Sequence, residues 1–253
     1  MEKLLEGRVA VVTGGGKGVG AGISKLLAAE GAKVVFNYNS NPSLAEKTVE
    51  YIKQQGGEAY TCPVDVQYRD QVEAMMNKAV ELYGGIDILV NNAAYQPNLD
   101  IDEYTEELYD QVMNINLGGY FRCMQAALPY LKQSKCPRII NISSVHAKRP
   151  GDFDVCYSMT KGGITMLTRE AAVEFSKYGI TVNAILPGGI IIEFKTGTTH
   201  RFKFKRIQRA RTYNLRMPGM PEDVGNIVVF LASEKGGHIN GASIRADKGA
   251  MLF

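Results

Sequence analysis

Three side chains that can exchange a proton with a substrate oxygen lie close together in the sequence. Tyr157 and Lys161 are four residues apart in a segment of helical pattern, so they share one helix face. Ser144 comes at the end of an apolar, strand-like run. A free tyrosine has a pKa of about 10, and a nearby ammonium group would lower that pKa toward the working pH. A phenol of this kind beside a serine hydroxyl suits the interconversion of a carbonyl and an alcohol.

A glycine-rich turn near the start of the chain is the second chemical feature. The segment reads Thr13-Gly14-Gly15-Gly16-Lys17-Gly18-Val19-Gly20, between an apolar run and a helical pattern. Such a turn lets backbone N–H groups and the positive end of a helix approach a pyrophosphate. The spacing of Gly14, Gly18 and Gly20 is not the commoner G-x-G-x-x-G. The turn therefore indicates a dinucleotide site, with a tight turn that binds no ligand as the alternative.

Short apolar runs alternate with helical patterns along the whole chain. The runs are rich in Val and Ile, as expected for strands buried on both faces. They cover Arg8–Thr13, Lys33–Tyr38, Glu58–Val64, Ile86–Asn91, Arg138–Ser143, Thr181–Leu186 and Ala242–Ala246. The helical patterns cover Gly20–Glu30, Pro42–Gln55, Gln67–Tyr83, Thr105–Lys132, Val155–Tyr178 and Pro221–Ser233.

This alternation predicts an α/β fold: a single Rossmann-type, doubly wound parallel sheet of about seven strands with helices on both faces. We expect one domain over residues 1–253, because no linker divides the pattern. The segment 188–214 is basic and has no period, and we interpret it as a substrate lid.

Composition narrows the class of protein. The net charge is +3, too small to indicate nucleic-acid binding, and no apolar run reaches the roughly 18 residues that span a bilayer. The first residues lack the apolar stretch of a signal peptide. The four cysteines have no CxxC spacing and no histidine cluster, which argues against a metal site or a disulfide framework. We expect free thiols and a cytoplasmic protein.

The chemical residues belong to a set of motifs that extends from Thr13 to Gly249. The motifs are Thr13-Gly14-x3-Gly18-x-Gly20, Asp65-Val66, Asn91-Asn92-Ala93, Asn114-Ile115-Asn116-Leu117-Gly118-Gly119, Ile142-Ser143-Ser144, Tyr157-Ser158-Met159-Thr160-Lys161, Asn183-Ala184-x2-Pro187-Gly188 and Pro221-Glu222-Asp223-Val224. With all of them the chain resembles the short-chain dehydrogenase/reductase family. The resemblance implies an NAD(P)-dependent oxidoreductase.

The resemblance also implies catalytic roles at matching positions. Tyr157 would be the general acid and base, and Ser144 would orient the substrate oxygen. Lys161 would bind the nicotinamide ribose and lower the tyrosine pKa. Asn116 would interrupt its helix and hold a water that links Lys161 to solvent, although an asparagine bonded only to its local backbone is the alternative.

Contacts to the cofactor follow from the same resemblance. Asp65 and Val66 would contact the adenine, and Asn92 and Ala93 would flank the cofactor, with a simple turn former as the alternative for Asn92. The implied cofactor contacts are Gly14, Gly16, Lys17, Gly18, Val19, Gly20, Tyr38, Asn39, Ser40, Asp65, Val66, Asn92, Ala93, Ala94, Tyr157, Lys161, Pro187, Gly188 and Ile190. The chain departs from the family pattern at three positions, which are Ala94 in place of glycine, Ile192 in place of threonine, and Lys248 in place of glycine.

The end of the second apolar run bears on the choice of cofactor. NAD-binding folds of this kind usually place an acid there to bond the ribose hydroxyls. The run ends without an acid, and Tyr38 stands where the acid is expected. Lys17 can attract a 2′-phosphate, with Asn39 or Ser40 as hydrogen-bond partners, and a solvated turn residue is the alternative for Lys17. We therefore expect NADP(H) to be preferred, while NAD(H) can also serve.

The substrate is less well defined by the sequence. His146 follows Ser144 closely and can bond a substrate hydroxyl, or it is a loop residue without a role. The stretch His200–Arg211 carries six Lys or Arg and no acid, which fits an anionic substrate or a solvated loop. A 3-oxoacyl thioester and a sugar or polyol are the competing substrates. A non-catalytic dinucleotide-binding sensor or scaffold is the rival function.

Family members pair two long helices across two-fold axes. The matching segments here are Thr105–Lys132 and Val155–Tyr178. By resemblance we expect a homotetramer or a dimer, with a small carbonyl or alcohol as the other partner.

Overall fold

A seven-stranded parallel sheet forms the centre of the molecule. The computed structural model describes residues 3–150, 154–192 and 218–252. The strand order is β3-β2-β1-β4-β5-β6-β7, and every neighbouring pair is parallel. The strands are β1 (Val9–Val12), β2 (Lys33–Tyr38), β3 (Glu58–Pro63), β4 (Ile88–Asn91), β5 (Arg138–Ile142), β6 (Thr181–Pro187) and β7 (Ser243–Ala246). The predicted doubly wound α/β fold is confirmed.

The central strands are apolar because both faces of the sheet are covered. Every residue of β1, β4, β5 and β6 is buried. Successive residues alternate between two core clusters, so Ala10 and Val12 pack on one face while Val9 and Val11 pack on the other. This is why the sequence shows continuous apolar runs instead of alternation.

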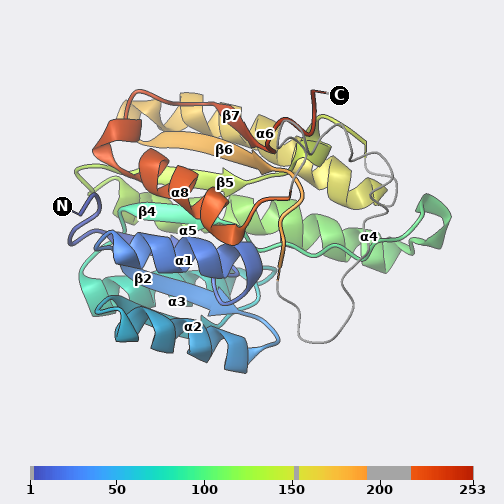
Figure 1. Ribbon diagram of the computed structural model, residues 1–253. Helices are drawn as coiled ribbons and strands as arrows, with labels where there is room; N and C mark the ends of the chain where they lie inside the picture. Colours follow the sequence, from blue (N-terminus) through green and yellow to red (C-terminus); the bar gives the residue numbers. More distant parts are fainter. Residues whose placement is uncertain (1–2, 151–153, 193–217, 253) are drawn as a thin grey trace, which may run out of the picture.

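Helices cover the two faces in separate layers, visible in Figure 1 in front of and behind the sheet. One core cluster contains side chains of α1 (Gly18–Ala29), α2 (Pro42–Gln54) and α8 (Pro221–Ala232). The other contains side chains of α3 (Arg69–Tyr83), α5 (Gly119–Leu131) and α6 (Val155–Phe175). Helices α1 and α8 approach closely at Gly22 because glycine has no side chain. A Cβ at this position would lie only 2.5 Å from the Cβ of Pro221.

The predicted helix over Thr105–Lys132 is divided in the structure. Helix α4 (Glu106–Met113) leads into a π-helical turn at Asn114–Gly118, which leads into α5. The sequence pattern over Thr105–Lys132 predicts one continuous α-helix and does not reveal the wider π-helical turn at Asn114–Gly118. The division falls at Asn116, where the family resemblance implies an interruption.

The sheet order reverses between β1 and β4. From β1 the chain moves outward through β2 and β3, then crosses to β4 on the other side of β1. The carboxyl ends of β1 and β4 therefore border a crevice at a topological switch point, which is where open α/β sheets bind ligands. The glycine turn follows β1, and Asn92 follows β4.

Candidate active site

Ser144, Tyr157 and Lys161 meet beside the carboxyl end of β5. Ser144 is buried just after this strand, and the other two residues lie in the first two turns of α6. The Tyr157 hydroxyl shares a hydrogen bond with Ser144. The Lys161 nitrogen Nζ lies 5.2 Å from the centre of the Tyr157 ring. The structure thus brings together the three side chains that were predicted to form one proton-transfer site.

Lys161 is fully enclosed by the strand and by two phenol rings. Its Nζ donates to the carbonyl oxygen of Ile142 at 2.8 Å, and the Tyr120 hydroxyl donates to the same oxygen at 2.8 Å. The Tyr120 ring centre lies 5.6 Å from Nζ, on α5. Burial disfavours the charged amine and lowers the pKa of Lys161 to about 7. This amine can therefore gain and lose a proton near neutral pH.

The phenol of Tyr157 is held in its protonated form. Burial raises its pKa above the ordinary value, the hydrogen bond with Ser144 opposes that shift, and the charge of Asp154 adds to it. The sequence predicts instead that Lys161 lowers this pKa. In this structure desolvation has the larger effect, because an amine with a pKa of about 7 is only partly charged at neutral pH.

Asn116 is buried and its amide is fully engaged. Its Oδ1 accepts from the backbone N–H of Tyr95 at 2.7 Å, and its Nδ2 donates to the Tyr95 carbonyl oxygen at 2.9 Å. The same Nδ2 lies 3.2 Å from Thr160 Oγ1, on α6. Asn116 therefore ties the segment after β4 and the π-helical turn to the catalytic helix. Its role in holding a water stays a prediction.

The glycine turn has the shape that a pyrophosphate needs. Gly14 and Gly18 have φ values of 65° and 53°, a region that favours glycine. A Cβ at Gly20 would lie 2.1 Å from the Gly14 carbonyl oxygen. The Lys17 side chain does not cap α1, so no side chain at the N-cap satisfies the first N–H groups of this helix. The residues present fit an anionic group at this end of α1.

The neighbouring strand ends hold the turn in place. Thr13 Oγ1 accepts from the backbone N–H groups of Asn92 and Ala93 at 2.8 and 3.0 Å, and Asn92 Nδ2 donates to the Thr13 carbonyl oxygen at 2.9 Å. Asn37, which is not among the predicted site residues, is buried in β2 and accepts from Gly14 N at 2.9 Å. A lone polar residue in an otherwise apolar run is the signal that could have found it.

The expected adenosine end gathers residues from β2 and from the loop after β3. Asn39 Nδ2 donates to the Asp65 carboxylate at 3.1 Å, and Gln67 N donates to the same carboxylate at 2.9 Å. Val66 is buried against Gly119, whose Cβ would lie 2.8 Å from a Val66 methyl carbon. Tyr38 is half-buried and Ser40 is exposed. The end of β2 therefore carries no acidic residue of its own, but the Asp65 carboxylate from the loop after β3 lies beside it.

The segment after β6 begins over the glycine turn. Gly188 N donates to the Ala246 carbonyl oxygen at 3.0 Å, next to Pro187 at the end of β6. Ile190 forms a bridge with Gly219, and the Ile192 side chain lies 3.4 Å from where a Cβ on Gly18 would stand. The remainder of the predicted lid, including the basic stretch 200–211, lies outside the described residues.

The other expected contact residues are spread around this crevice. Gly16 faces α2, since its Cβ would lie 2.9 Å from that of Ala45. Val19 is half-buried in α1, and Ala94 is exposed after β4. The His146 ring meets the Tyr157 ring edge-on at 6.3 Å between centres, and its backbone N–H donates to Ser144 Oγ at 3.2 Å. His146 therefore lies beside Ser144 and the Tyr157 ring.

Membrane-spanning helices and metal-binding clusters are both absent from the described residues. Within the described ranges, none of the helices is both long and apolar enough to cross a membrane. No three His, Cys, Asp or Glu side chains in the described segments are grouped to hold a metal ion.

Known proteins are similar to this chain in sequence. The family model described as enoyl-(acyl carrier protein) reductase matches residues 14–251. Glucose 1-dehydrogenase 2 of Bacillus subtilis is 35% identical over 255 residues, covering 100% of this chain and 98% of the relative. A 3-oxoacyl-[acyl-carrier-protein] reductase of Staphylococcus aureus is 35% identical over 243 residues, covering 96% and 98%.

A solved structure agrees with these relatives. The short chain dehydrogenase from Burkholderia cenocepacia, in complex with NADP, superposes with a TM-score of 0.87 at 30% identity and covers 98% of this chain and 99% of that one. This chain is therefore an oxidoreductase that belongs to the short-chain dehydrogenase/reductase family.

Proposed function

We propose that the protein is an NADP(H)-preferring oxidoreductase that interconverts a ketone and a secondary alcohol, with Tyr157 as general acid and base. The observation that carries the proposal is the meeting of the Tyr157 phenol, the Ser144 hydroxyl and the buried Lys161 amine beside β5. A phenol that can pass its proton to a bound oxygen is the group that carbonyl reduction requires.

The chain's own residues divide the work of the reaction. When bound, the nicotinamide cofactor supplies the hydride for reduction or accepts it in oxidation. Ser144 holds the substrate oxygen beside the phenol, and Tyr157 donates its proton to that oxygen. Lys161, with a pKa of about 7, returns a proton to the phenolate, and we assign the link to solvent to a water beside Asn116.

The pH dependence of the two directions follows from the protonation state of the phenol. Burial raises the pKa of Tyr157, so the protonated form predominates at neutral pH. Protonated phenol is the form that donates to a carbonyl, whereas alcohol oxidation requires phenolate. Near neutral pH Tyr157 is therefore in the form that carbonyl reduction uses, and the rate of alcohol oxidation should rise with pH.

The preference for NADP(H) rests on the region around the end of β2. No acid stands at Tyr38, Asn39 or Ser40, and Lys17 lies in the glycine turn. The Burkholderia structure holds NADP. The carboxylate of Asp65 at 3.1 Å from Asn39 works against a phosphate at this place. NAD(H) therefore remains able to serve as a second cofactor.

The substrate classes proposed are a 3-oxoacyl thioester and a sugar or polyol. Relatives of similar identity are named for each, one as a glucose 1-dehydrogenase and one as a 3-oxoacyl-[acyl-carrier-protein] reductase. An anionic substrate would be drawn by the basic stretch 200–211. His146 is the residue we assign to a substrate hydroxyl.

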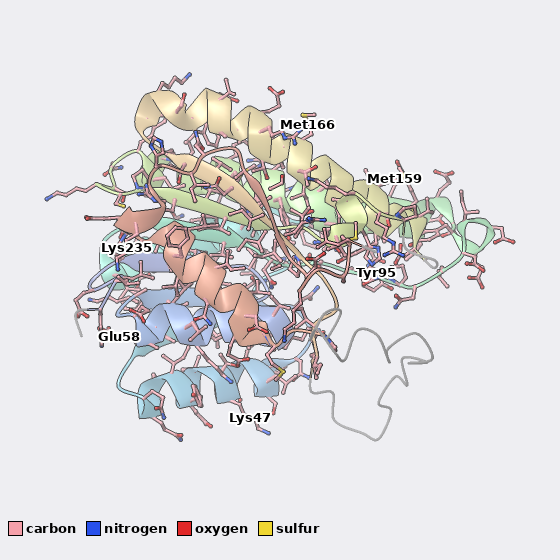
Figure 2. The ribbon with its side chains drawn as sticks, turned by 45° about the horizontal axis from the view of Figure 1, so that its top comes forward. Lys47, Glu58, Tyr95, Met159, Met166 and Lys235 are labelled. Carbon is pink, nitrogen blue, oxygen red and sulfur yellow. The ribbon has the colours of Figure 1, made fainter. Side chains whose placement is uncertain are left out.

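We also propose a cytoplasmic homotetramer, or a dimer, that assembles through the helical segments Thr105–Lys132 and Val155–Tyr178. An apolar groove runs between the π-helical turn, α5 and α6. It is lined by Met113, Leu117, Gly118, Phe121, Gly163, Met166, Leu167 and Glu170. Phe121 and Met166 are half exposed, and Figure 2 labels Met166 along α6.

The four free cysteines support a reducing compartment.

A panel assay tests the function. NADPH and NADH absorbance is followed with acetoacetyl thioesters, aldoses, polyols and simple ketones, together with cofactor binding by fluorescence. We expect NADPH oxidation with at least one carbonyl of the two proposed classes. Tight dinucleotide binding without turnover on any member would instead favour the sensor or scaffold.

A further inference from the structure

Asp154 is a buried carboxylate at the start of the catalytic helix, and the mechanism above does not use it. It is only 4% exposed and is the N-cap residue of α6. Its Oδ1 accepts from the backbone N–H of Tyr157 at 2.9 Å and from the Tyr104 hydroxyl at 2.7 Å. Its Oδ2 lies 3.2 Å from the N–H of Asn98. Helix α6 and two residues of the segment between β4 and α4 therefore meet at one carboxylate.

A charge at this position requires an explanation beyond helix capping. Serine, threonine and asparagine cap helices about as well as aspartate, and they avoid the cost of burying a charge. No lysine or arginine in the described segments forms an ion pair with Asp154. Its oxygens accept from neutral donors, and the positive end of α6 is what compensates its negative charge.

The bonds of Asp154 join the catalytic helix to the segment between β4 and α4. Asn98 has a φ of 60°, an uncommon backbone state that turns its N–H toward the carboxylate. Tyr104 anchors the far end of the same segment. Tyr95, at its near end, is held by Asn116. The segment 95–104 is thus fastened at both ends to residues that position Tyr157.

The groups that face Tyr157 come from every element around it. Lys161 from α6 lies 5.2 Å from its ring, His146 from the turn after β5 lies 6.3 Å away, and Tyr120 from α5 interacts with it electrostatically. Among the described residues, Asp154 is the carboxylate that acts on it, and its charge adds to the upward shift that burial gives the Tyr157 pKa.

We infer that Asp154 is a positioning residue for carbonyl reduction. It fastens the first turn of α6, and with it Tyr157, to the segment 98–104, and its negative charge adds to the effect of burial in holding the proton on the phenol. The inference rests on the proposed role of Tyr157. It assigns to one side chain both the placement of the proton donor and an electrostatic contribution to holding its proton.

The first experiment separates the effect of the Asp154 charge from the role of Asp154 as the N-cap residue of α6. Asp154→Asn keeps an oxygen that can accept from Tyr157 N and the Tyr104 hydroxyl, but it removes the charge. The pH profile of kcat for NADPH-dependent reduction is compared with wild type. Loss of the charge should move the basic limb to lower pH by about one unit, the order expected for one nearby charge at partial burial. A basic limb that coincides with wild type would overturn the inference.

The second experiment tests the fastening. Tyr104→Phe removes the hydroxyl that donates to Asp154 but leaves the Asp154 charge in place. The loss of this hydrogen bond should lower kcat about three- to ten-fold. The basic limb of the pH profile should stay where it is in wild type. Tyr178→Phe, on a distant turn after α6, is the matched control. Unchanged kcat in Tyr104→Phe would remove the fastening role.

Two further measurements keep the outcomes distinct. If Asp154→Asn does not fold by circular dichroism, Asp154→Ser supplies a neutral cap for the same pH profile. Tyr157→Phe is assayed in parallel. Full activity in Tyr157→Phe would defeat the proposed function itself, whereas an inactive Tyr157→Phe with an unshifted Asp154→Asn profile would defeat only the role of Asp154.

Discussion

Lys161 lies 5.2 Å from the centre of the Tyr157 ring, one helical turn away on α6. Its nitrogen donates a hydrogen bond to the backbone of β5 at Ile142. The amine is therefore buried beside the phenol, and burial favours the neutral form of both groups. This arrangement has consequences for stability as well as for proton transfer.

Lys161→Met should make stability less dependent on pH. The folded pKa is about 7, against 10.5 for the ordinary amine. Between these values the unfolded chain binds more protons, so wild-type stability rises with pH across this window and is lowest below pH 7. The variant should be more stable than wild type at pH 6 by a few kcal/mol, at roughly 1.4 kcal/mol for each pH unit that separates the two pKa values. The gain should shrink toward pH 10.

Urea unfolding from pH 6 to 9.5 measures this gain. Lys47→Met, at an exposed position of α2, is the matched control and should show no such trend. A constant difference between Lys161→Met and wild type at every pH would contradict the account of a desolvated amine.

Gly20→Ala should damage both the fold and cofactor binding. The new Cβ would stand 2.1 Å from the Gly14 carbonyl oxygen, so the turn must open. We expect a loss of about 3 kcal/mol in the free energy of unfolding and at least a ten-fold weaker NADPH affinity. At Gly85 a Cβ would meet no atom within 4 Å, so Gly85→Ala is the control. Equal behaviour of the two variants in thermal melts and NADPH titration would refute the packing argument.

The fold was predictable because its signals are local and repeated. The apolar runs Arg8–Thr13 and Ile86–Asn91 predict buried strands from their pattern, and the structure confirms a seven-stranded parallel sheet. The division of Thr105–Lys132 at the π-helical turn was not identified from the helical period of the sequence. Only the family resemblance pointed to Asn116.

Tyr38→Asp should move the cofactor preference toward NAD. A carboxylate at the end of β2 would repel a 2′-phosphate and can bond ribose hydroxyls. The ratio of kcat/KM for NADPH to that for NADH should fall by about ten-fold or more. Lys17→Ala should lower the same ratio, while Lys25→Ala, farther along α1 and over the Tyr51 ring, should leave it unchanged. Equal losses with both cofactors in Lys17→Ala would show that Lys17 does not recognise the phosphate.

Met166→Glu should break the proposed assembly. The charge would enter the apolar groove between α5 and α6, where an uncompensated carboxylate is costly to bury. Light scattering at micromolar concentration should give a multiple of 27.7 kDa for wild type and a smaller species for the variant. Leu82→Glu, at an exposed site of α3, should keep the wild-type mass. A wild type that is already a 27.7 kDa monomer would contradict the assembly.

The supporting residues of the site were beyond the reach of sequence reasoning. Tyr157, Lys161 and Ser144 carry chemical signals in their types and spacing. Asp154 and Tyr104 lie fifty positions apart, and nothing in either local sequence shows that they share a hydrogen bond. Such contacts depend on how the segment after β4 folds against α6, which becomes known only from coordinates.

Tyr157→Phe tests the central claim most directly. The variant keeps the ring and removes the transferable proton. The measurement is kcat for NADPH-dependent reduction of the substrate found in the panel, with NADPH affinity followed by fluorescence. We predict a fall in kcat of about 100-fold or more, the range for a positioned acid or base, with NADPH affinity retained. Turnover close to that of wild type would contradict the account that Tyr157 supplies the proton.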